Sequence, residues 1–141
     1  MPQSSPDHPR NSKLMRLYLL FAAVLLVPIA LAYGIAPAAT VPRLFDIAVT
    51  TADQKQIFRA LMCLYLGLSA YWVYAAFTAA WQRPAVALAV IFCFSLALGR
   101  GISLVADGPA SRLLDIYLVV EILGGLLGIA VLAYERRKSR R

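Results

Sequence analysis

Four long apolar stretches constrain this chain more than any other feature of its sequence. They cover residues 14–36, 58–81, 85–106 and 113–134, and each is near the ~20 residues that a helix needs to cross ~30 Å of hydrocarbon. They are rich in leucine and alanine and lack the alternation of barrel strands, and backbone groups in lipid must bond within their own segment. The sequence therefore predicts an all-α integral membrane protein, built as an antiparallel four-helix bundle.

The connections between the stretches predict how the helices follow one another. Residues 82–84 (Gln-Arg-Pro) leave room only for a tight turn, and residues 107–112 contain Asp-Gly-Pro, which is turn chemistry. The first connection, residues 37–57, is long enough to hold structure of its own, and residues 50–54 offer a helix start within it.

The placement of charge predicts the topology. Of the 141 residues, 61% are hydrophobic and 15% are charged, yet the net charge is +7. With both termini on the inner side, that side carries nine cations and two acids, while the outer side carries five of each. By the positive-inside rule the whole excess marks cytoplasmic termini, so it gives no reason to expect a nucleic-acid partner.

Polar tails flank the predicted membrane domain, which covers residues 14–135. Residues 1–13 are predicted to form a flexible tail, because they are polar and contain proline, serine and asparagine. Residues 136–141 follow the last stretch directly, and such a basic cluster attracts anionic headgroups by about 1 kcal/mol per residue. The expected lipid contacts are Arg136, Arg137, Lys138, Arg140 and Arg141.

The first stretch has a second interpretation. Basic residues, an apolar run to Val27, the helix-breaking Pro28 and an Ala-Leu-Ala motif resemble a secretory signal peptide with its cleavage site. Apolar sequence continues to Ala39, and the charges of the later loops favour an inner N-terminus, which supports a membrane span. Cleavage would leave three spans and an outer N-terminus, and both interpretations stay open.

Two charged side chains lie inside predicted spans, where a charge costs about 2.5–3.5 kcal/mol on insertion scales. At ~1.5 Å per residue, Arg100 lies about 9 Å and Glu121 about 12 Å below the outer ends of consecutive antiparallel helices. Their matching depth predicts a buried ion pair.

Other polar residues are expected to join this pair. Ser103 and Asp107 share a helix face with Arg100, and Arg59 lies at the outer mouth of the second span, within reach of a long side chain. Tyr65 is expected at the floor of the cluster, with Tyr71 or Tyr74 as further candidates. Such a cluster either locks the helices in register or forms a ligand, ion or proton site. Its predicted members are Arg59, Arg100, Ser103, Asp107 and Glu121.

Glycines mark the faces where helices are expected to come close. In the last span Glu121 shares a stripe with three glycines, two of which form a GxxxG pattern that lets another backbone approach. Glu121 is therefore expected to point into the bundle. The predicted packing residues are Gly67, Gly124, Gly125 and Gly128.

The predicted spans contain no histidine and no recognisable arrangement of side chains for metal, cofactor or covalent chemistry. The single histidine, His8, lies in the polar tail, and Cys63 and Cys93 lie at different depths, which argues against a disulfide. No phosphate-binding loop, metal-ligand motif or nucleophile–base pair is visible. We expect no catalytic residue, no metal and no cofactor.

The order of several short motifs between residues 17 and 135 resembles a family of small four-span bacterial membrane proteins, classified as a domain of unknown function in the DUF series. The layout is also loosely similar to that of DoxX-like four-span proteins, some of which accompany quinone-linked redox enzymes. The resemblance implies a bacterial inner-membrane protein and carries no activity or catalytic residue. The motifs are Phe58-Arg59-Ala60, Gly67, Gly99-Arg100 with Ser103, Asp107-Gly108-Pro109 and Glu121.

Three functions follow as hypotheses. The first is a non-catalytic accessory, interaction or small-ligand-binding protein, with membrane lipids, another protein or a second copy as partners. The second is a small transporter or proton-coupled channel that uses the polar cluster, although the inner halves of the spans offer little polar lining. The third is a quinone-linked redox subunit, which no visible haem ligand or metal site supports.

Overall fold

The computed structural model describes residues 11–140 and contains five helices within them. These are α1 (Lys13–Gly34), α2 (Pro37–Leu44), α3 (Ala52–Phe77), α4 (Ala79–Asp107) and α5 (Arg112–Lys138). All except the short α2 are long and apolar enough to cross a membrane, which confirms the prediction of an all-α protein with four candidate spans. Most of the predicted N-terminal tail lies outside the described residues.

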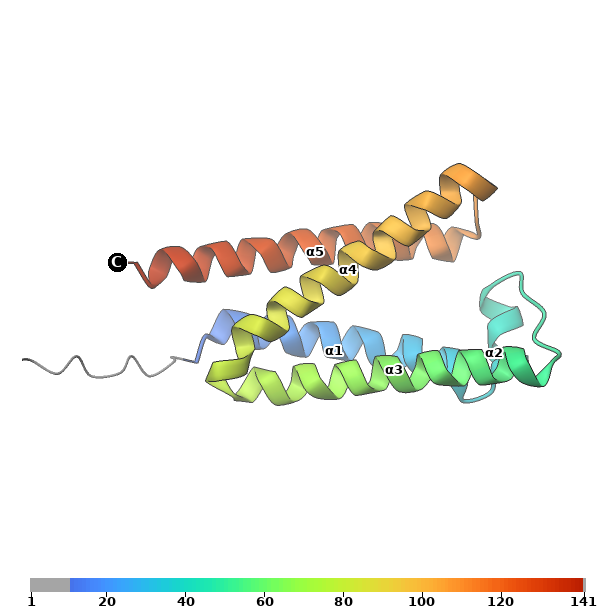
Figure 1. Ribbon diagram of the computed structural model, residues 1–141, viewed down its shortest axis with the longest axis horizontal. Coiled ribbons are helices and arrows are strands. Elements are labelled where there is room, and N and C mark those ends of the chain that lie inside the picture. Colours follow the sequence, from blue (N-terminus) through green and yellow to red (C-terminus); the bar gives the residue numbers. More distant parts are fainter. Residues whose placement is uncertain (1–10, 141) are drawn as a thin grey trace, which may run out of the picture.

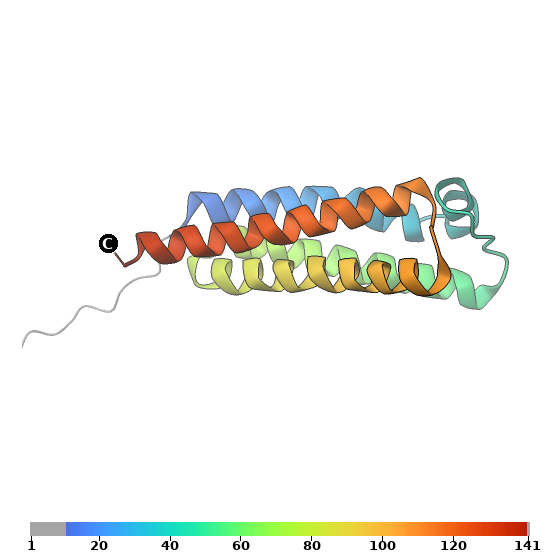
Figure 2. The same cartoon turned by 90° about the horizontal axis from the view of Figure 1, so that it is seen from above.

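The four long helices run antiparallel in chain order and form two layers (Figures 1 and 2). α1 packs mainly on α3, and α4 packs mainly on α5. Both described ends of the chain and the α3–α4 turn lie at one end of the bundle, which we call the termini end. The short α2 lies at the opposite end, the α2 end, and α4 leans away from α1 and α3 as it approaches this end (Figure 1).

The turn between the second and third spans does not lie at residues 82–84, where the sequence predicted it. The chain reverses at Thr78, whose backbone is extended, and residues 82–84 belong to the start of α4. Gln82 explains the difference, because its side chain is buried and serves two other helices. Its Nε2 donates a hydrogen bond to the carbonyl of Ala76 at 3.0 Å, and its Oε1 accepts one from the amide of Ser12 at 2.8 Å.

Ser12 extends this network to the last helix. Its hydroxyl caps α1 by accepting a hydrogen bond from the amide of Met15 at 3.2 Å. The same hydroxyl donates to Oε1 of Glu135 at 2.7 Å. Four helices are thus joined by hydrogen bonds at the termini end, through residues whose connection no local sequence pattern predicts.

The first connection holds structure of its own, as expected. α2 begins with proline and places Val41 against Phe45 and Val49 in a small second core. The predicted helix start is also confirmed, since Thr51 and Gln54 form a capping box in which each side chain bonds the other's backbone amide. This second core packs on Tyr33 and Tyr117, so α2 lies close to two aromatic residues of the long helices.

The glycines of α5 lie where helices touch. A Cβ at Gly128 would lie 2.5 Å from Val90 Cγ2 and 2.6 Å from the hydroxyl of Tyr18, while one at Gly125 would lie 2.8 Å from Phe94. Gly124 is less confined, with Cys93 Sγ at 3.4 Å from such a Cβ. These contacts come from α4 and α1, so the α5 glycines allow two neighbours to approach.

Gly67 behaves differently from the α5 glycines. It is exposed on α3, and a Cβ there would meet nothing within 4 Å, so the expected packing role is wrong at this position. Instead α1 and α3 approach at Gly34, where an added Cβ would collide with the side chain of Met62. Gly34 ends its span, and no periodic glycine pattern marks it.

Candidate functional site

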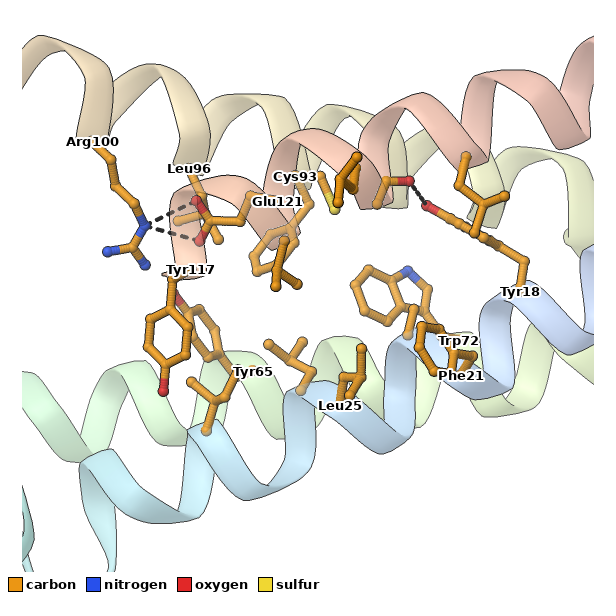
Figure 3. Close-up of a pocket in the computed structure, with 18 of the residues that line it drawn as sticks. Tyr18, Phe21, Leu25, Tyr65, Trp72, Cys93, Leu96, Arg100, Tyr117 and Glu121 are labelled. Carbon is orange, nitrogen blue, oxygen red and sulfur yellow. Dashed lines mark hydrogen bonds and ion pairs between the residues drawn. The ribbon is translucent and has the colours of Figure 1, made fainter. Parts of the chain in front are cut away.

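A cavity of about 340 Å³ lies inside the bundle between α1, α3, α4 and α5 (Figure 3). This volume falls within the range of small-molecule sites, which are apolar hollows with a few placed polar groups. The walls are aromatic and aliphatic, and the charged groups among the lining residues are Arg100 and Glu121. The cavity therefore combines one polar region with a longer apolar region.

The ion pair that the matching depths predicted is present. Nε of Arg100 on α4 donates to both carboxylate oxygens of Glu121 on α5, at 3.0 and 2.9 Å. The two side chains are 21% and 12% exposed, so the pair is largely shielded by protein. Both of these bonds use Nε, so the Nη groups of Arg100 do not bond Glu121. The hydroxyl of Tyr33 on α1, which also lines the cavity, is a polar neighbour of this guanidinium.

The other expected members of the cluster do not join this pair. Ser103 donates to Asp107 Oδ2 at 2.8 Å, and both residues are exposed near the end of α4. Arg59 is exposed on α3 and forms no ion pair with the described part of the chain. The lean of α4 explains the separation, because residues beyond Arg100 are carried away from α1 and α3 (Figure 1).

Ser103 instead borders a second hollow of about 230 Å³ between α4 and α5. Arg100 borders this hollow as well as the main cavity, and Asp115 supplies an acidic group to it. Arg100 thus lies between the two hollows and borders both.

A chain of aromatic rings leads away from the ion pair along the cavity. The guanidinium carbon of Arg100 lies 5.4 Å from the ring centre of Tyr117, within cation–π range. Tyr65, expected at the floor of the cluster, does line the cavity, whereas Tyr71 and Tyr74, the further candidates, are not among its lining residues. The ring of Tyr65 stands edge-on to Phe92 at 5.5 Å. Phe92 then meets Trp72 edge-on at 5.7 Å.

Trp72 lines the cavity and carries a buried indole N–H. Its side chain is 2% exposed, and its Nε1 is buried and has no hydrogen-bond partner among residues 11–140. Figure 3 shows the indole turned toward the open centre of the cavity, between Tyr65 and Tyr18. The hydroxyl of Tyr18, by contrast, donates to the carbonyl of Gly124 at 3.0 Å.

The side of the cavity between α1 and α5 is bordered by residues that are both exposed and apolar. The two helices contact each other less than α1 contacts α3 or α4 contacts α5. In a bilayer these exposed side chains would meet lipid, so the cavity is bordered by hydrocarbon on this side. They are Phe21 and Leu25 on α1, and Val120, Leu123 and Leu127 on α5.

The aromatic lining was not predicted beyond Tyr65. Trp72, Phe92 and Tyr18 lie in spans where outward and inward faces are equally apolar, so the sequence carries no periodic signal for them. Groups of three or more potential metal-binding side chains do not occur within residues 11–140. The basic residues Arg136, Arg137, Lys138 and Arg140 are exposed at the termini end, while Arg141 lies outside the described residues.

Comparison with known proteins identifies the family. The family DUF4345, a domain of unknown function, matches residues 14–132. Since this covers most of the chain, the chain belongs to that family, and the resemblance drawn from the motif order is confirmed. No curated protein matches the chain, and no solved structure matches it.

Proposed function

We propose that this member of the DUF4345 family is a non-catalytic integral membrane protein that binds a small amphipathic molecule in the cavity between its four long helices. One observation carries the proposal: the Arg100–Glu121 pair borders about 340 Å³ of otherwise apolar space. A pair that only locked helices together would be expected in close-packed surroundings. Here the Nη groups of Arg100, which do not bond Glu121, are donors that an occupant can use.

The alternatives have less support. The pair joins α4 to α5, and α1 and α3 contribute no charged partner to it, so it does not lock all four helices. For an ion or proton path, polar side chains would have to continue toward the termini end. Among the lining residues on that side, Cys93, Trp72 and Tyr18 are the polar exceptions in an aliphatic and aromatic wall.

A cavity-filling variant tests the proposal. Leu96→Trp places a large ring in the cavity, whereas Leu98→Trp adds the same ring on the exposed side of the same helix, outside the cavity lining. Native mass spectrometry of protein purified in mild detergent is expected to detect a bound small molecule with the wild-type chain and with Leu98→Trp. Leu96→Trp is expected to lose it. Equal adducts on both variants would contradict binding in this cavity.

We further propose that the termini end faces the cytoplasm of a bacterial inner membrane. Among the described residues, the half of the bundle at the termini end carries seven cations and one acid, whereas the half at the α2 end carries five cations and five acids. The positive-inside rule therefore favours this orientation. Retention of α1 is part of the proposal, because α1 supplies one wall of the cavity. The exposed basic residues that end α5 would then contact anionic headgroups.

Cysteine labelling in intact cells tests this orientation. In a background of Cys63→Ser and Cys93→Ser, the single variants Ala48→Cys and Ser139→Cys place an exposed thiol at the α2 end and the termini end respectively. A membrane-impermeant maleimide is expected to label Ala48→Cys and to leave Ser139→Cys unlabelled until the cells are lysed. The opposite pattern would reverse the topology.

A further inference from the structure

The exposed side of the cavity limits how an occupant reaches it. The bordering side chains on α1 and α5, such as Leu25 and Leu123, are 40% and 59% exposed and carry no polar group. A molecule that passes between them travels through hydrocarbon, so its leading surface must be apolar. This favours a lipid-like chain that enters sideways from the bilayer over a solute that arrives from water.

The polar region of the cavity limits the charge of the head group. Arg100 and Glu121 cancel each other's charge, and both line the cavity. An anionic head that reached the guanidinium would also lie near the carboxylate, and a cationic head would lie near the guanidinium, where low permittivity magnifies repulsion. An uncharged head with a donor and an acceptor, such as a hydroxyl, can bond to the Nη groups of Arg100 and to Glu121 without that cost.

Trp72 supplies a second contact at a defined depth. It follows Tyr65 by seven residues on α3, which is about 10 Å along the helix, and Tyr65 lines the cavity near the ion pair. The indole of Trp72 faces the cavity (Figure 3), and the apolar surface of its ring can contact a hydrocarbon chain at this depth. An occupant whose head lies at Arg100 therefore runs its chain past this indole.

We infer that the cavity binds a single-chain lipid with an uncharged polar head, held by Arg100 and Glu121, whose chain extends past Trp72 after entering between α1 and α5. The inference rests on the proposed function and deepens it by naming the class of ligand. Two features together define this class of ligand. The neutral ion pair favours an uncharged head group, and the open apolar side favours a hydrocarbon chain.

Tryptophan fluorescence tests the inference with 11-bromoundecan-1-ol, whose chain is long enough to bring its bromine, a contact quencher, to the depth of Trp72. The chain has two tryptophans, so Trp81→Phe leaves Trp72 as the single reporter. Trp72→Phe leaves Trp81, which is 47% exposed and outside the cavity lining, as a matched control for probe dissolved in the micelle. We expect saturable loss of at least half of the Trp72 emission and a shallow, linear loss from Trp81.

The head group is tested with 11-bromoundecanoic acid at pH 9, where its carboxyl is ionised. The acid is expected to need about tenfold more probe than the alcohol for half-quenching of Trp72, because its charge faces Glu121. Saturation by the acid at an equal or lower concentration would overturn the uncharged head and leave the proposed binding function standing. Parallel linear quenching of both tryptophans by both probes would overturn the proposed function as well.

Discussion

Reversing the charge of Arg100 or of Glu121 alone is expected to lower the free energy of unfolding by about 3–5 kcal/mol, and combining Arg100→Glu with Glu121→Arg is expected to restore more than half of the loss. Each single variant places two like charges on the facing sides of α4 and α5, in largely shielded surroundings. The double variant returns opposite charges to the same two helices. Titration with SDS in mixed micelles, monitored by circular dichroism, measures the free energies of unfolding of the two single variants and of the double variant.

The matched control is Arg59→Glu. Arg59 is exposed and forms no ion pair with the described residues, so its reversal is expected to change the free energy of unfolding by less than about 1 kcal/mol. A double variant that regains nothing would show that Arg100 and Glu121 do not stabilise the fold as a pair. A loss for Arg59→Glu as large as for Arg100→Glu would instead restore the five-residue cluster that the sequence predicted.

The ion pair was predictable because it depends on the depth of each residue and on the helix face that carries it, and both follow from residue spacing. Depth follows from counting residues along a helix of known rise, and antiparallel neighbours convert equal depths into proximity. The count is insensitive to errors of a few residues at the span ends, since both side chains are long. The helix start at residues 50–54 was predictable for a different reason, because helix-capping residues form a local pattern that needs no knowledge of the rest of the fold.

The prediction of a wider, five-residue cluster was wrong because such a cluster depends on helix tilt. Helical periodicity correctly placed Ser103 and Asp107 on one face, and they do bond each other. It could not show that α4 leans away from α1 and α3, because tilt is set by packing against neighbours rather than by the pattern of one helix. The misplaced turn has a related cause, since Gln82 looks like a loop residue until its two partners on other helices are known.

The cavity itself could not be predicted from this sequence. In a soluble bundle, apolar residues mark the core, but in a membrane the lipid-facing side chains are equally apolar. Trp72, almost fully buried, and Tyr74, more than half exposed, lie two residues apart in one apolar helix. Only packing distinguishes the residue that lines a cavity from the one that faces lipid.

Substituting Gly128 by alanine is expected to lower the free energy of unfolding by about 1–3 kcal/mol, the usual cost of forcing an extra carbon into a packed site. The new Cβ would lie 2.5 Å from Val90 Cγ2 and 2.6 Å from the hydroxyl of Tyr18. Tyr18 cannot move aside freely, because its hydroxyl donates to the carbonyl of Gly124. Either α5 separates from α1 and α4, or this hydrogen bond is lost, and both outcomes are destabilising.

Gly67→Ala is the matched control, since it makes the same chemical change inside a helix with nothing within 4 Å of the added carbon. It is expected to stabilise the protein by up to about 1 kcal/mol, because alanine is the better helix former. SDS titration of both variants gives the comparison, and equal effects would show that close approach at Gly128 is unimportant. Because Tyr18 and Gly124 also line the cavity, Gly128→Ala is expected to weaken the saturable quenching of Trp72, whereas Gly67→Ala is expected to leave it unchanged.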